Sequence, residues 1–151
     1  MERLFTPRAL GEIAIRCRVM APMVRFYRDM VGLTVLEGGE EAAITFFSLG
    51  ESCAGHTAVL ALFAPGSGTR PGLHPDGQPQ TGGRSSLHHL ALSLPWAEQD
   101  AVMAWYDHHG LDYRVELFDW IGWRGIFTRD PEGNTVELVA KDPGWSDPKD
   151  A

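Results

Sequence analysis

The amino-acid sequence predicts an α+β fold of two βαβββ modules that form a curved, half-open mixed β-barrel with the helices outside. A strand-like segment at residues 10–17 recurs 77 positions later, at residues 87–94. Each copy is followed by one helical segment and then by three further strand-like segments. One helix covers only one face of a sheet, so we expect the two sheets to meet edge to edge with their other faces turned inward.

The first module is expected over residues 9–64. Its opening segment alternates apolar and other side chains with the period of a strand that buries one face. In the helical segment, methionine and aromatic side chains are spaced i, i+3, i+4 and i+7, so we expect them in the core, and Gly32 ends the helix. The predicted elements are a strand at 10–17, a helix at 20–32, and strands at 33–36, 43–49 and 57–64.

A linker or lid is expected at residues 65–84, which contain four prolines and six glycines. The second module is expected over residues 85–142, followed by a polar tail at 143–151 that frays. Together they form one domain over residues 1–151. The predicted elements of the second module are a strand at 87–94, a helix at 95–109 with Trp105 in the core, and strands at 113–118, 123–128 and 135–140.

Composition and charge narrow the function. The net charge is −7 and the basic residues are scattered, which argues against a nucleic-acid surface and favours a small-molecule partner. No apolar run approaches the roughly 20 residues of a membrane-spanning helix, and no signal peptide is recognisable, so we expect a cytoplasmic protein that does not bind membranes. Cys17 and Cys53 have no spacing typical of zinc or disulfide sites, and we expect two unpaired thiols.

Acidic and histidine side chains fall at related places in the two modules. The 77-residue offset aligns Glu12 with His89 and Leu60 with Glu137. Glu12, His89 and Glu137 therefore form a candidate metal site on the inward face. One imidazole and two carboxylates suit a divalent ion such as Fe, Mn, Ni or Zn, with open positions for substrate. The carboxylates of Glu12 and Glu137 can also move a proton, and His56 is a candidate acid–base residue.

Each of these residues also has a structural interpretation. Glu137 fits a solvent-facing position on a strand, and His89 fits a hydrogen-bonded histidine on a polar face. Glu12 can pair with Arg16 on the same face of its strand. His88 is expected to point to the opposite face from His89, so it competes as a ligand only through a β-bulge.

Several motifs resemble the vicinal oxygen chelate superfamily, which includes glyoxalase I, methylmalonyl-CoA epimerase, extradiol dioxygenases, and fosfomycin- and bleomycin-resistance proteins. The resemblance covers residues 9–142. Its most specific motif is Phe-Thr-Arg-Asp-Pro-Glu-Gly-Asn-Thr-Val-Glu-Leu at 127–138, supported by Leu-Gly-Glu-Ile-Ala-Ile-Arg at 10–16 and Leu-His-His-Leu-Ala-Leu at 87–92. It implies paired βαβββ modules around a metal, with ligands on the first and fourth strands of each module, and it implies a homodimer.

The resemblance maps the four ligand positions to Glu12, Leu60, His89 and Glu137. Glutamate stands at the first position, where histidine is most frequent, and Leu60 cannot bind a metal, so the four-ligand pattern of glyoxalase I is incomplete. We expect a metal-dependent dioxygenase or lyase/isomerase that acts on a small molecule with vicinal oxygens. The alternative is a non-catalytic, bleomycin-resistance-type protein that sequesters an aromatic or cationic compound. The net charge of −7 suits such a ligand, as do Trp96, Trp105, Trp120 and Trp123.

Overall fold

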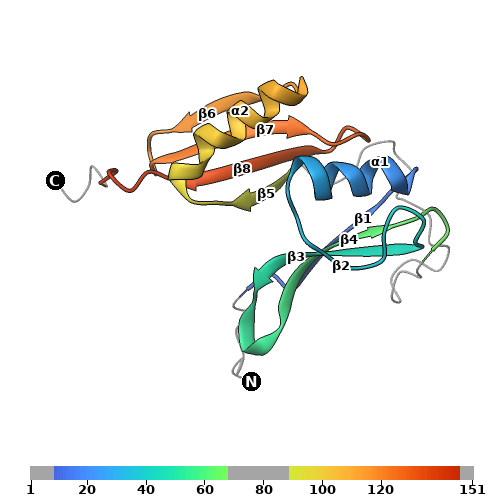
Figure 1. Ribbon diagram of the computed structural model, residues 1–151. Helices are drawn as coiled ribbons and strands as arrows, with labels where there is room; N and C mark the ends of the chain where they lie inside the picture. The colour runs from blue at the N-terminus through green and yellow to red at the C-terminus, as the bar shows by residue number, and fades with distance from the viewer. Residues whose placement is uncertain (1–8, 68–88, 147–151) are drawn as a thin grey trace, which may run out of the picture. The chain divides into compact units, whose positions relative to one another are not determined.

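A computed structural model describes residues 9–67 and 89–146 of the chain (Figure 1). The chain divides into two compact units, Met1–Gln78 and Pro79–Ala151. Each unit holds one four-stranded mixed sheet with the βαβββ order, so the predicted α+β class and the two modules are confirmed. The joining of the two sheets into one half-open barrel stays a prediction. The predicted linker or lid at 65–84 lies outside the described residues, apart from its first three.

The first unit contains a sheet in the order β1-β4-β3-β2. Strand β1 runs parallel to β4, and the other neighbouring strands are antiparallel. The elements are β1 (Glu12–Arg16), α1 (Met20–Arg25), a π-helical turn η1 (Phe26–Met30), β2 (Val35–Glu37), β3 (Ile44–Glu51), a short turn η2 (Cys53–Gly55) and β4 (Thr57–Phe63).

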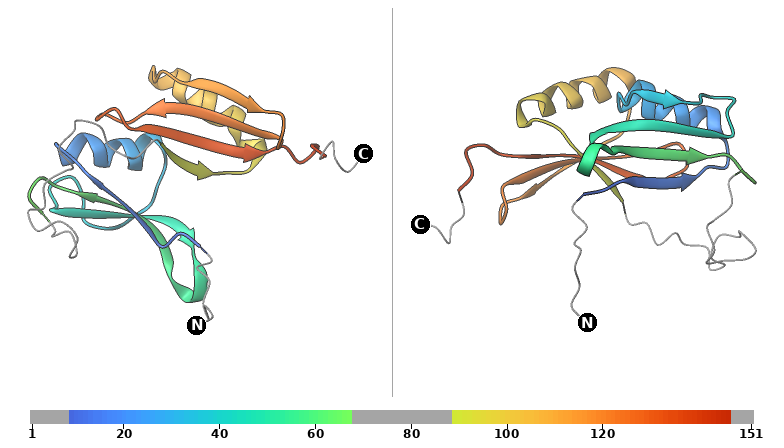
Figure 2. Two further views of the ribbon diagram at one scale, coloured as in Figure 1. Left: turned by 180° about the vertical axis from the view of Figure 1, so that it is seen from behind. Right: turned by 90° about the horizontal axis from the view of Figure 1, so that it is seen from below.

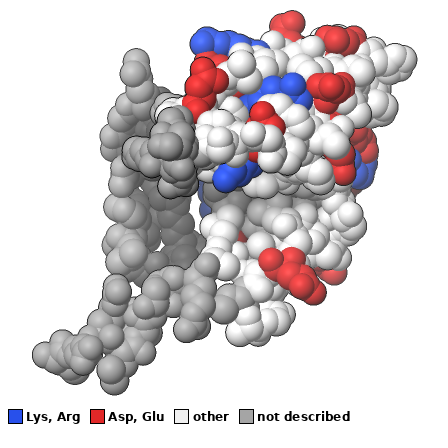
Figure 3. Space-filling model, turned by 90° about the vertical axis from the view of Figure 1, so that its left-hand side faces the viewer, with Lys and Arg blue, Asp and Glu red and all other residues white. Residues whose placement is uncertain are grey.

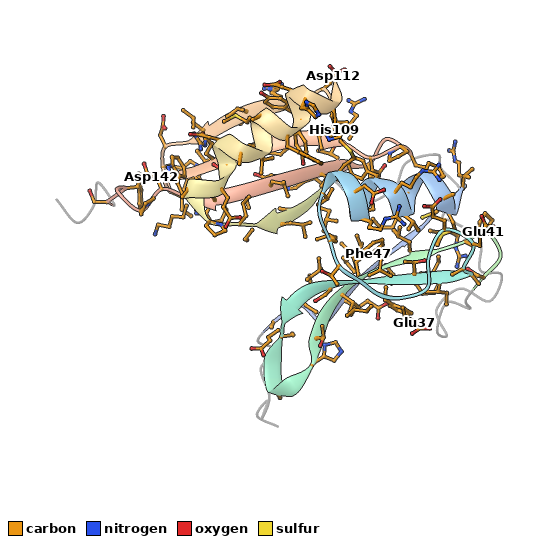
Figure 4. The ribbon with its side chains drawn as sticks, viewed as in Figure 1. Glu37, Glu41, Phe47, His109, Asp112 and Asp142 are labelled. Carbon is orange, nitrogen blue, oxygen red and sulfur yellow. The ribbon has the colours of Figure 1, made fainter. Side chains whose placement is uncertain are left out.

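The helix of the first unit differs from the regular helix predicted at 20–32. After α1 the chain widens into η1, where the backbone N–H of Val31 donates to the carbonyl of Phe26 at 3.0 Å. Gly32, at φ 86°, then ends the helix as predicted. The wider turn accompanies complete burial of Tyr27, whose ring lies 6.1 Å from that of Phe47 on β3, labelled in Figure 4. A spacing pattern of 3.6 residues carries no signal for this extra residue.

The second unit repeats the topology in the order β5-β8-β7-β6, with β5 parallel to β8. Figure 2 shows α2 on one side of this sheet in both views. The elements are β5 (Leu90–Ser93), a 3-10 turn η3 (Trp96–Glu98), α2 (Gln99–His109), β6 (Arg114–Phe118), β7 (Trp123–Arg129) and β8 (Thr135–Lys141).

A buried glutamine joins α2 to its sheet. The side-chain amide of Gln99 is fully buried and donates to the carbonyls of Arg124 at 2.7 Å and Leu138 at 3.2 Å. Its carbonyl oxygen accepts from Arg124 Nε at 2.6 Å. A buried polar group is tolerated only when its hydrogen bonds are satisfied, as they are here. The start of α2 is thereby fixed against β7 and β8.

The expected core position of Trp105 is wrong, because 45% of its surface is exposed. It packs instead against the exposed ring of His109 at the end of α2, and the two ring centroids are 4.1 Å apart. Figure 4 labels His109. The buried face of α2 carries Gln99 and Tyr106, which are seven positions apart, so the helix is rotated away from the face expected from apolar residues alone.

The turn before β8 is built around one carboxylate. Asp130 accepts hydrogen bonds from the backbone N–H of Glu132 and of Asn134 at 3.0 and 2.9 Å, and from Asn134 Nδ2 at 2.7 Å. Gly133 adopts φ 85°, which favours glycine. The most specific motif of the sequence is therefore a rigid turn that sets where β8 begins.

The predicted fraying of the tail is wrong for residues 143–146. Trp145 Nε1 donates to the carbonyl of Asp119 at 2.8 Å, and the indole covers Gly122 in the β6–β7 turn. Cys17 is buried in the core of the first unit. No helix within the described part of the chain is long and apolar enough to cross a membrane.

Removing the Tyr106 hydroxyl should stabilise the protein. This hydroxyl is buried and has no hydrogen-bond partner among the described residues, and burial raises its pKa to about 12. We expect Tyr106→Phe to increase the free energy of unfolding by about 1 kcal/mol at pH 7. The unfolded tyrosine ionises near pH 10, so wild-type stability should fall between pH 10 and 12 and the advantage of the variant should grow there.

Urea denaturation of both proteins across this pH range checks the prediction. Tyr113→Phe is the matched control, because the Tyr113 hydroxyl donates to Asp107 at 3.4 Å and its loss should bring no gain at pH 7. A Tyr106→Phe variant less stable than the wild type would contradict the prediction.

Candidate functional site

Strand register assigns the side chains of the second sheet to two faces. Ile126 pairs with Leu138, and both are buried on the side of α2. Glu137 pairs with Ala91 on β5 and with Phe127 on β7, so these side chains lie on the opposite face, called here the far face. The far face carries His89, Ala91, Arg114, Glu116, Phe118, Trp123, Gly125, Phe127, Glu137 and Val139.

His89 and Glu137 lie together on the far face. His89 precedes Ala91 by two residues, so its side chain points to the same side as Glu137 on the adjacent strand. His89 Nε2 lies 3.3 Å from Glu137 Oε2. The His89 ring meets Phe127 edge to face at 6.1 Å. Two of the three predicted ligands therefore converge, Glu137 on β8 and His89 directly before β5.

The carboxylate of Glu137 is in surroundings that disfavour its charge. Only 5% of the residue is exposed, whereas about a third of the His89 side chain is. Burial raises the pKa of Glu137, the nearby carboxylate of Glu116 raises it further, and the imidazole of His89 acts in the opposite direction. Glu116 itself forms an ion pair with Arg114 on the same strand.

The Glu137 carboxylate lies over Gly125, a position without a side chain on the neighbouring strand β7. Gly125 on β7 has no side chain, and a Cβ atom built there would overlap Glu137 Oε1 and lie 3.1 Å from Glu137 Cδ. The carboxylate thus occupies the space that a side chain at position 125 would fill.

The third predicted ligand, Glu12, belongs to the first unit. It is exposed on β1 and pairs with Val59 on β4. The alternative pairing with Arg16 is not formed: Arg16 donates to the carbonyls of Ala64 at 3.1 Å and Ser67 at 2.7 Å. Within the described residues of its own unit, Glu12 has no salt-bridge partner.

The alignment of Leu60 with Glu137 is wrong by one residue. Ala91 pairs with Glu137 in the second unit, and the corresponding Ala14 pairs with Ala61 in the first. Ala61 therefore takes the place of Glu137, and Leu60 lies on the other face in the fully buried core. Neither alanine nor leucine can bind a metal, so the first unit still supplies only one ligand-capable side chain at the two related positions.

His56 is exposed between η2 and β4, in the first unit. Its ring lies beside Gly11, the residue before Glu12, because a Cβ atom at Gly11 would be 3.5 Å from His56 Cε1. His56 is thus a neighbour of the strand that carries Glu12. The competing His88 lies outside the described residues.

The His89–Glu137 pair fits a metal ion. Two ligands at about 2.0–2.2 Å from one ion, in tetrahedral or octahedral geometry, are themselves about 2.8–3.6 Å apart. The 3.3 Å separation falls in this range, and one imidazole with one carboxylate is a donor set that first-row divalent ions accept. The pair alone is not a complete site, and no group of three or more metal-binding side chains is formed among residues 9–67 and 89–146.

The tryptophans do not form one surface. Trp123 lies on the far face, whereas the Trp96 ring lies under the Arg124 guanidinium, 4.3 Å away, on the α2 side. Trp105 is on α2 against His109, and Trp120 is 73% exposed in the β6–β7 turn. The four tryptophans that would suit an aromatic or cationic ligand therefore lie on different faces and elements of the second unit.

Charged side chains of both signs mix on the face of the molecule shown in Figure 3. On this face the described residues form no extended cationic patch of the kind that binds phosphate backbones.

Sequence reasoning missed two residues of the far face. Glu116 has the right parity in its predicted strand to share a face with Glu137, but a single glutamate on a strand usually meets solvent. Gly125 carried a usable signal, because a glycine inside a strand often marks a close approach by another group.

Comparisons with known proteins agree with this architecture. Residues 9–138 match the family model of the Glyoxalase/Bleomycin resistance protein/Dioxygenase superfamily. A search of curated protein sequences found no match. Solved structures with a similar fold include a glyoxalase/dioxygenase from Nostoc punctiforme, with 19% identity, a TM-score of 0.63, and 94% of this chain and 99% of that chain covered.

Two further structures have the same fold. A lactoylglutathione lyase from Agrobacterium tumefaciens is 21% identical with a TM-score of 0.60, covering 89% of this chain and 94% of that one. The fosfomycin resistance protein FosX from Mesorhizobium loti is 17% identical with a TM-score of 0.58, covering 89% of this chain and 92% of that one.

Replacing Glu137 with glutamine should stabilise the metal-free protein in a pH-dependent way. A carboxyl whose pKa is raised on folding favours the folded state least when it is ionised, so its contribution to stability falls as the pH rises through its folded pKa. We expect the denaturation midpoint of Glu137→Gln, measured in EDTA, to exceed that of the wild type at pH 8. This difference should shrink as the pH falls through the raised pKa of Glu137, where the carboxylate gains a proton.

Glu98→Gln, at an exposed carboxylate of η3, is the control and should show no such pH-dependent gain. A gain for Glu137→Gln that grows toward acid pH would refute the assignment of burial as the main cause.

Proposed function

Because the chain belongs to the Glyoxalase/Bleomycin resistance protein/Dioxygenase superfamily, we propose that it is a metal-dependent enzyme acting on a small molecule with vicinal oxygens. The observation that supports this most is the approach of His89 Nε2 to Glu137 Oε2 at 3.3 Å on the far face. A purely structural role for this pair would leave unexplained why a carboxylate is buried where its charge is disfavoured.

Glu12, His89 and Glu137 are the residues proposed to hold the metal. A bound divalent ion would polarise the two adjacent oxygens of the substrate. Two carboxylates and one imidazole make a harder, more anionic donor set than the sites that use two histidines, which favours Mn or Fe over Ni or Zn. Ala61 at the fourth related position supplies no ligand.

The protein's own side chains would supply the proton transfers. Glu137 is proposed as one carboxylate that accepts a proton from a substrate carbon or hydroxyl and returns it. Glu12 is exposed on its strand and is the second carboxylate candidate. His56, beside the residue that precedes Glu12, is proposed as an acid–base residue acting on the substrate.

The protein is further proposed to act as a homodimer, as members of this superfamily frequently do. The alternative, a binding protein for an aromatic or cationic compound, has less support because the tryptophans are dispersed over different faces and elements. The reaction class within the superfamily, dioxygenase or lyase/isomerase, is to be decided by assay with catechols and with α-ketoaldehyde hemithioacetals.

Metal binding is the first test. Protein purified without chelators, and protein stripped and titrated with Mn²⁺, Fe²⁺, Ni²⁺ or Zn²⁺, should bind about one ion per chain by elemental analysis and calorimetry. We expect Glu12→Ala, His89→Ala and Glu137→Ala each to weaken binding by at least about 100-fold, because losing a ligand costs more than the 10–100-fold typical of its supporting partners.

His109→Ala is the matched control, since this histidine is exposed at the end of α2. Full binding by His89→Ala, or no stoichiometric binding by the wild type to any of the four ions, would sink the proposal.

His56 allows chemistry to be separated from metal binding. Once an active substrate is found, His56→Ala should reduce kcat by about 10²–10⁴-fold, the usual contribution of a general acid or base, while the metal affinity stays at the wild-type value. An unchanged kcat and pH profile would show that His56 is only a surface residue.

A further inference from the structure

Gly125 is a glycine whose backbone does not require glycine. It lies in the middle of β7, between Glu116 of β6 and Val139 of β8, and its φ is not positive. Glycine weakens the interior of a strand, because it adds backbone entropy to the unfolded chain and buries no side chain. Its presence here therefore requires a cause other than chain conformation.

The surroundings of Gly125 supply that cause. A Cβ atom at this position would overlap Glu137 Oε1 and approach Phe127 Cε2 to 2.7 Å. Both neighbours are on the far face, and both also contact His89: Glu137 through Oε2 at 3.3 Å and Phe127 through its ring. One oxygen of the carboxylate thus lies above the glycine while the other faces the imidazole.

We propose that Gly125 is a positioning residue that seats the Glu137 carboxylate so that Oε2 faces His89 Nε2. The gap left by the missing side chain lets the carboxylate lie flat over β7 instead of standing off the sheet. The effect of Gly125 on metal binding rests on the proposed function. The effect of Gly125 on the contact between His89 and Glu137 does not.

An alanine at this position should move the carboxylate more readily than the strand. The overlapping Glu137 atom is the far end of a flexible side chain, so rotation of Glu137 relieves that conflict, and the edge of the Phe127 ring, whose Cε2 would lie 2.7 Å away, has to move as well. We therefore expect Gly125→Ala to fold and to lose the His89–Glu137 contact.

The first measurement needs no metal. In EDTA, the ring resonances of His89, assigned with a His89→Ala variant, report on the carboxylate beside Nε2. In Gly125→Ala they should shift to the positions found in Glu137→Ala. Gly144→Ala is the matched control: its φ is also not positive, and among the described residues its Cβ would meet only the carboxylate of Asp142, at 3.3 Å, so it should leave these resonances unchanged. Wild-type resonances of His89 in Gly125→Ala would overturn the inference.

The second measurement connects the contact with metal binding. Gly125→Ala should raise the Kd for Mn²⁺ by about 10–100-fold, as expected when a ligand loses its supporting geometry, and Gly144→Ala should leave it unchanged. If the wild type binds no Mn²⁺ or other divalent ion, the proposed function fails while the His89 resonances still decide the role of Gly125. Unchanged Mn²⁺ affinity of Gly125→Ala would overturn the positioning role.

A stability comparison covers the case in which Gly125→Ala folds poorly. If the conflict is with Glu137, Gly125→Ala should lower Tm more in the wild type than in a Glu137→Ala background, by several degrees. An equal loss in both backgrounds would mean that Gly125 serves only the packing of Phe127, which contradicts the proposal.

Discussion

The parallel pairing of β5 with β8 is the contact on which the candidate site depends. The two strands are separated in the chain by α2, β6 and β7, and they become neighbours only because β8 inserts between β5 and β7. Their register places Ala91 opposite Glu137, and His89 is then one step along the same face. Without this pairing the His89 imidazole and the Glu137 carboxylate would not lie close together.

Two buried polar groups hold that register in place. Asp130 closes the turn that starts β8, and the Gln99 amide bonds to carbonyls of both β7 and β8. A slip of one residue would turn Glu137 toward α2 and bring an apolar neighbour to the far face. The motif at 127–138 therefore has mainly a structural role. Its turn fixes the register of β8 that places Glu137 beside His89.

Much of the architecture could be predicted from residue spacing. Alternation located the strands, the repeat located the modules, and parity put His89 and Glu137 on one face. The position of the first module that is related to Glu137 could not be predicted in the same way, because a constant offset assumes equal connections in both modules. One residue of difference moved the related position from Leu60 to Ala61 and to the other face. The burial of Gln99 could not be predicted for a different reason. Apolar periodicity assigns only apolar residues to the core, and glutamine is polar.

The two modules share a backbone plan but not a chemistry. At the related positions the first unit offers Glu12 and Ala61, and the second offers His89 and Glu137. The acidic donor on the last strand is thus confined to the second unit, where apolar surroundings and Glu116 disfavour its charge and only His89 opposes them. A carboxylate kept in such a place lowers the stability of the empty protein, and a cation or a proton offsets that cost when it binds. Gly125 makes this position accessible to the carboxylate, so the backbone of β7 contributes to the site as directly as the side chains do.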